Sequence, residues 1–77
     1  MKLKISNEDQ VLQGDTYTEI VEQLRDGSKF ASNENIATYM QGFSKRYAEL
    51  TGKNISSENA QTFVQDLIAS KYLIAET

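Results

Sequence analysis

The sequence predicts a small α+β domain in which an amino-terminal β-hairpin packs on a core of three helices. Residues 1–6 alternate apolar with polar side chains, which is the period of a half-buried strand. Three later segments carry apolar side chains three and four residues apart, which is the period of an amphipathic helix. An all-α three-helix bundle is the alternative if residues 1–13 form no sheet.

Length and composition indicate one domain over residues 1–77 with a single small core. The 77 residues, of which 39% are hydrophobic, suffice for that core and no more. The chain has no cysteine, so it forms neither a disulfide nor a thiolate zinc site. Its start lacks the apolar run of a signal peptide, and its longest apolar run, residues 72–75, is far shorter than the ~20 residues of a membrane span. We therefore expect a cytoplasmic protein with no membrane partner.

Each predicted element has its own signals, beginning with the hairpin over residues 1–13. Residues 7–10 are a polar cluster suited to a turn, and Val11-Leu12-Gln13 follow as a short return strand. The first helix, about residues 17–26, opens with the capping box Thr16-Tyr17-Thr18-Glu19 and ends before Gly27. Its apolar positions follow helical spacing: Tyr17, Ile20, Val21 and Leu24.

The second helix, about residues 33–50, is the longest. Ser32 or Asn33 is its expected cap, Glu34 lies in its first turn, and Gly52 ends it. Tyr39 widens an apolar stripe made of Ile36, Met40, Phe43, Tyr47 and Leu50. Phe30, in the link before this helix, is expected to fill the core beneath that link.

The third helix, about residues 57–70, has Ser56 or Ser57 as its expected cap and Glu58 in its first turn. It carries the fullest apolar face of the chain: Ala60, Phe63, Val64, Leu67 and Ile68. Ile55, just before this helix, is expected to point inward. Residues 72–75 fit either a last helical turn or a short strand, and we favour an extended segment beside the hairpin.

No catalytic, cofactor or metal motif is recognisable, so we expect a protein that is not an enzyme. Without histidine or cysteine, acid–base or nucleophilic chemistry would depend on carboxylates, lysine or hydroxyl groups. The acidic residues are scattered over turns and polar helix faces, and the four glycines are isolated. The sequence therefore predicts no bound cofactor and no metal.

Residues 33–74 offer one resemblance, carried by two helices followed by Lys71-Tyr72-Leu73-Ile74. This arrangement resembles half of a winged-helix domain, and the resemblance implies a helix-turn-helix DNA-binding regulator. The sequence departs from that family where glycine usually precedes the apolar pair, and the link over residues 51–56 is longer than the usual ~3–4-residue turn. The formal net charge of −3 and the single cation near the third helix, Lys71, disfavour a nucleic-acid partner.

The remaining function class is a non-catalytic protein-interaction module of unknown process whose partner is an unidentified protein or a second copy. Tyr39, Arg46 and Tyr72 are the candidate contact residues, because tyrosine and arginine are enriched in binding hot spots. Tyr39 and Arg46 lie seven residues apart, on one edge of the second helix. The alternative interpretation is structural: Tyr39 closes the rim of the core, and Arg46 covers it with its aliphatic stem.

Overall fold

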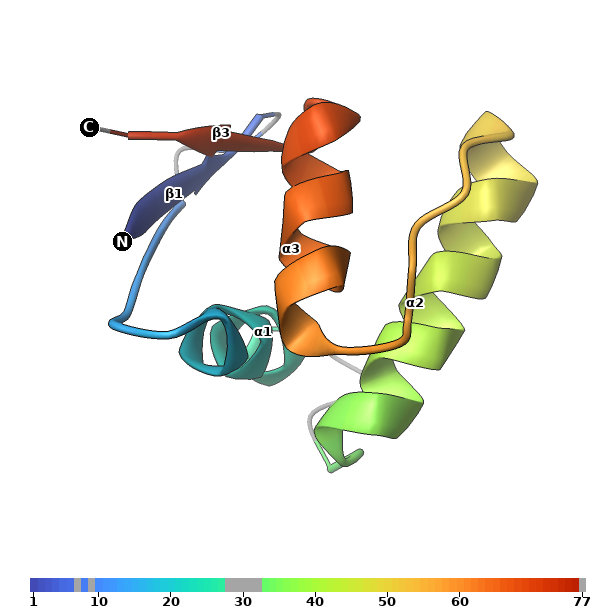
Figure 1. The fold of residues 1–77 in the computed structure, drawn as a ribbon, viewed down its shortest axis with the longest axis horizontal. Coiled ribbons are helices and arrows are strands. Elements are labelled where there is room, and N and C mark those ends of the chain that lie inside the picture. Colours follow the sequence, from blue (N-terminus) through green and yellow to red (C-terminus); the bar gives the residue numbers. More distant parts are fainter. Residues whose placement is uncertain (7, 9, 28–32, 77) are drawn as a thin grey trace.

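The computed structural model describes residues 1–6, 8, 10–27 and 33–76, and it confirms the α+β fold class (Figure 1). The elements follow the predicted order. In sequence they are β1 (Lys2–Ile5), β2 (Val11–Gln13), α1 (Tyr17–Asp26), α2 (Ile36–Thr51), α3 (Ala60–Ala69) and β3 (Leu73–Ala75). None of the described helices is both long and apolar enough to cross a membrane.

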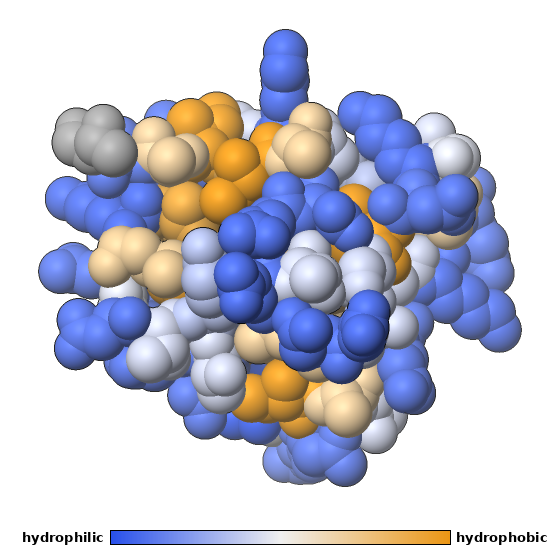
Figure 2. Space-filling model, in the orientation of Figure 1, coloured by the Kyte–Doolittle hydropathy of each residue, from blue (hydrophilic) through white to orange (hydrophobic). Residues whose placement is uncertain are grey.

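The three strands form one antiparallel sheet in the order β2-β1-β3. Residues 73–75 are therefore a strand beside the hairpin, as the sequence analysis favoured. The alternation of β1 places Leu3 on the covered face of the sheet, opposite Leu12 of β2. The other face carries Lys4 between Val11 and Ile74, both more than 40% exposed. Figure 2 shows hydrophobic residues gathered over the β3 end of the molecule.

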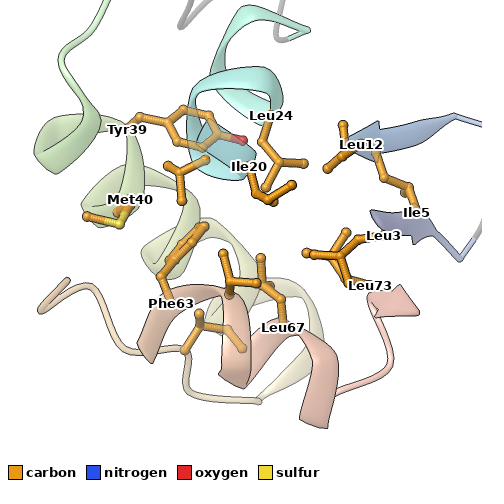
Figure 3. Packing of buried hydrophobic residues seen from close by; sticks show 13 residues of the cluster. Leu3, Ile5, Leu12, Ile20, Leu24, Tyr39, Met40, Phe63, Leu67 and Leu73 are labelled. Atoms are coloured by element: carbon orange, nitrogen blue, oxygen red, sulfur yellow. The ribbon is translucent and has the colours of Figure 1, made fainter. Parts of the chain in front are cut away.

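One hydrophobic core joins the sheet to the helices, with α1 packed against β2 and α3 packed against both α1 and β3. Apolar side chains from all six elements converge there (Figure 3). The largest fully buried side chains are Phe63, Leu12, Ile20, Leu67, Leu73, Val21 and Val64. Ile55 is buried as predicted. Phe30 lies outside the described residues.

Two helices begin later than predicted, because asparagines outside the expected positions cap them. The Asn35 side chain accepts a hydrogen bond from the Thr38 N–H at 2.8 Å, so α2 begins at Ile36 and Asn33 is not its cap. Likewise, the Asn59 side chain accepts from the Thr62 N–H at 2.9 Å, so α3 begins at Ala60. The other predicted α2 cap, Ser32, lies outside the described residues.

The predicted caps of α3, Ser56 and Ser57, and the acidic residues Glu34 and Glu58 all precede their helices. The Ser56 N–H donates to the Asp66 carboxylate at 2.8 Å, and its hydroxyl lies 3.1 Å from that of Thr62. These contacts hold the link beside α3. The cap of α1 follows the prediction, since the Glu19 N–H donates to the Thr16 hydroxyl.

The end of α3 has a Schellman motif built on an unusual residue. The Tyr72 N–H donates to the Leu67 carbonyl, and the Lys71 N–H donates to the Ile68 carbonyl, both at 3.0 Å. Lys71 therefore takes the left-handed conformation, with φ 69°, which a Cβ atom disfavours. This turn positions Tyr72 and directs the chain into β3, which pairs with β1, and these contacts offset the strain.

We expect Lys71→Gly to raise the free energy of unfolding by about 0.5–1 kcal/mol, because glycine adopts positive φ without strain. Urea denaturation of both proteins measures the difference. Lys71→Ala is the matched control, since it also removes the charge but keeps the Cβ atom. An equal gain in the alanine variant would contradict this account.

We expect Asn35→Ala to lower the free energy of unfolding by about 1 kcal/mol, because it removes the side-chain acceptor at the start of α2. Asn33→Ala serves as the control, two residues earlier in an exposed turn, and should change stability by less than about 0.3 kcal/mol. Thermal unfolding followed by circular dichroism reports both values. The assignment of the cap fails if the two variants lose stability equally.

Candidate functional site

An aromatic cluster connects α2 to the end of α3. The Phe43 ring lies at the centre of this cluster, with its centroid 5.5 Å from that of Phe63 and 5.4 Å from that of Tyr72. Tyr47 stacks on Phe43 at 5.7 Å, and Tyr39 lies 6.0 Å from Phe43 on the other side. Edge and stacked contacts of this kind stabilise beyond the area they bury. The cluster therefore fixes the position of one side of α2.

Two adjoining hollows lie along this side of α2. The first has a volume of about 280 Å³ and extends to the hairpin and the end of α1, and the second has about 230 Å³ and lies toward the carboxyl end of α2. Both are lined by Phe43, Arg46 and Tyr72, so they form one continuous surface, which we call the α2 groove. Its lining residues on α2 and after α3 are Tyr39, Phe43, Arg46, Tyr47, Leu50 and Tyr72.

The structure brings all three sequence-predicted contact residues together in this groove. Arg46 and Tyr72 line both hollows, whereas Tyr39 lines only the first. Tyr39 is 4% exposed, so it closes the rim of the core, which was the alternative interpretation of this residue. Arg46 is exposed and Tyr72 is half-buried, so both side chains have solvent-accessible surface.

Arg46 lies over a position where α2 has no side chain. A Cβ atom built on Gly42 would lie 3.2 Å from the Arg46 Nη1 atom, so the glycine leaves room for the guanidinium to fold back along the helix. No carboxylate among the described residues forms an ion pair with Arg46. Arg46 therefore lines both hollows with a guanidinium that forms no ion pair with any described residue.

Burial disfavours ionisation of two phenol groups of the groove, those of Tyr39 and Tyr72. Burial raises the pKa of Tyr39 to about 12, with a smaller contribution from Tyr72 and an opposing one from the Arg46 charge. Burial also raises the pKa of Tyr72, and the Glu8 carboxylate adds to that shift.

The Tyr47 hydroxyl donates to the Ser70 hydroxyl at 3.3 Å, which ties the carboxyl end of α2 to that of α3.

Leu50 is the site residue that the sequence analysis assigned wrongly. It was predicted to complete the buried stripe of α2, but it is 85% exposed on the wall of the second hollow. The reason is that α2 diverges from α3 toward its carboxyl end, so the last turn lies beyond the core (Figure 1). The sequence held one signal: Leu50 is the last member of the stripe, two residues before the terminating Gly52.

The structural features that would serve other chemistry are few in the described part of the chain. No three potential metal-ligating side chains lie together there. On α3, the helix of the DNA-binding alternative, Gln61 and Gln65 are exposed. The Asp66 carboxylate on the same helix accepts a hydrogen bond from the Ser56 N–H, in the link between α2 and α3. The α2 groove is therefore the candidate functional site.

We expect the raised pKa of Tyr39 to make the protein less stable in alkali. The folded state favours the protonated phenol, so this contribution is fully present below pH ~10 and is lost as the pH rises toward ~12. Urea denaturation at pH ~9 and ~11 should show a loss of about 1 kcal/mol from this group. Tyr39→Phe should reduce the loss, leaving the part due to Tyr72. An unchanged pH dependence in Tyr39→Phe would refute the assignment.

No protein-family model, curated protein or solved structure matches this chain. The candidate site is therefore defined by its own residues and geometry.

Proposed function

We propose that this chain is a small, non-catalytic protein-interaction module that binds another protein, or a second copy of itself, through the α2 groove. The observation that carries the proposal is Leu50, a large apolar side chain 85% exposed on the wall of an aromatic hollow. Burying a leucine side chain is worth about 1.5–3 kcal/mol, and a partner that covers Leu50 gains this stabilisation.

The composition of the groove supports a protein partner. Tyrosine and arginine anchor many protein interfaces, since they combine a large contact area with hydrogen-bonding groups. Arg46 and Tyr72 supply these groups next to Phe43 and Leu50, whose surfaces are apolar. The aromatic cluster holds this wall in place before binding, which lowers the entropy cost of association.

The cellular setting remains that expected from the sequence, a cytoplasmic protein. This part of the proposal depends on the lack of cysteine and the lack of a long apolar run in the sequence. A helix-turn-helix DNA-binding regulator is the competing function, and binding to duplex DNA distinguishes it from the proposed one.

We expect Leu50→Glu to abolish capture of the partner from a lysate of the native host. Gln41→Glu is the matched control: it makes the same change in charge, and Gln41 is also exposed on α2. Nine residues separate the two positions, which places them on opposite sides of the helix. Quantitative mass spectrometry should find at least one protein retained by the wild type and by Gln41→Glu but depleted about tenfold or more with Leu50→Glu.

Two outcomes would refute the proposal. In the first, Leu50→Glu and Gln41→Glu capture the same proteins in equal amounts, and Leu50→Glu also self-associates as strongly as the wild type does. The other is tight, strongly salt-dependent binding to duplex DNA that weakens with Lys45→Ala, Arg46→Ala or Lys71→Ala, which would establish the helix-turn-helix function instead.

A further inference from the structure

We propose that the occupant of the α2 groove is a second copy of this chain, so that two α2 helices cross antiparallel about a two-fold axis. In this dimer each Leu50 enters the apolar part of the other copy's groove, and each Glu49 carboxylate meets the other copy's Arg46 guanidinium. The inference rests on the proposed function, and it names the partner of that same site.

One surface of the chain holds both an apolar anchor, Leu50, and a hollow that can receive it. Leu50 projects at the end of the groove, and Phe43, Tyr47 and Tyr72 line the hollow of about 230 Å³ beside it. A two-fold interface uses the same patch on both copies, so the patch has to be complementary to itself. A surface with only an anchor or only a hollow would require a different partner.

The same turn of α2 also carries complementary charges. Arg46 and Glu49 carry opposite charges, are both exposed, and lie three residues apart on neighbouring positions of the helix surface. Neither forms an ion pair with any residue that the structure describes. Across a two-fold axis, the carboxylate of each copy would meet the guanidinium of the other, which gives two equivalent charge-assisted contacts.

One register of the crossing allows both contacts, Leu50 in the hollow and Glu49 beside Arg46. In an antiparallel pair centred near residue 48, position 50 of one helix faces position 46 of the other, and position 49 faces position 47. Leu50 then lies over the stretch between Phe43 and Tyr47, where the hollow is, while Glu49 lies within one residue of Arg46. A single register of the two helices therefore makes both the apolar contact and the charged contact.

The predicted dimer is weak. A single crossing of two short helices buries less than the ~1,200 Å² at the low end of stable interfaces. We therefore expect a dissociation constant between about 10 μM and 1 mM.

Sedimentation equilibrium of the full chain from ~10 μM to ~1 mM tests the dimer directly. We expect a reversible monomer–dimer equilibrium that Leu50→Ser weakens about tenfold or more. Gln41→Ser, on the opposite side of α2, should leave the equilibrium unchanged within about twofold. Circular dichroism of both variants checks that the exposed substitutions leave the fold intact.

A charge-exchange experiment tests the pairing itself. Arg46→Glu and Glu49→Arg should each weaken the homodimer about fivefold or more, because each variant then places like charges across the axis. Mixing the two variants should restore association to within about threefold of the wild type, since every contact in the mixed dimer again joins opposite charges.

Three outcomes would overturn the second copy as the occupant: a monomer at every concentration, a dimer that Leu50→Ser leaves intact, or no recovery on mixing. These results are distinguishable from failure of the proposed function. A chain that stays monomeric but captures a host protein through Leu50 keeps the interaction function with a different partner, such as an acidic amphipathic helix.

Discussion

The buried face of α3 joins the sheet and the other two helices in a single core. Phe63, Val64 and Leu67 are completely buried, and they are the contacts through which the sheet and the two other helices share one core. α1 packs on this face from one side, and β3 continues directly from the end of α3 into the sheet. A chain this short has no second core to compensate for the loss of that face.

The same buried face explains why α2 has two different halves. Its first half contributes Tyr39 and Met40 to the core, where Tyr39 meets the edge of the Phe63 ring. Its second half diverges from α3 (Figure 1), and it is held by the aromatic contacts of Phe43 and Tyr47 with Tyr72 and by the Tyr47–Ser70 hydrogen bond. The groove thus lies where the carboxyl half of α2 leaves the core.

This origin gives the groove its mixed chemistry. The aromatic rings are shared with the core and are held by it, whereas Arg46 and Leu50 belong only to the surface. Gly42 adds to this arrangement, because its missing side chain lets Arg46, which lines both hollows, lie along the helix. An ordered apolar wall beside a charged group that no described residue neutralises is suited to recognition of another surface.

Local patterns determined the fold class, the bounds of α1, the hairpin and the buried face of α3, since alternation, helical spacing and the Thr16 capping box act over a few neighbouring residues. They also placed Tyr39 and Arg46 on one edge of the second helix, whereas the structure brings Tyr72 beside them. The structure was needed to show that Asn35 and Asn59 cap their helices and that Leu50 is exposed. The physical reason is that helical spacing specifies which side of a helix is apolar, whereas how far along its length that side stays covered depends on where the neighbouring elements end.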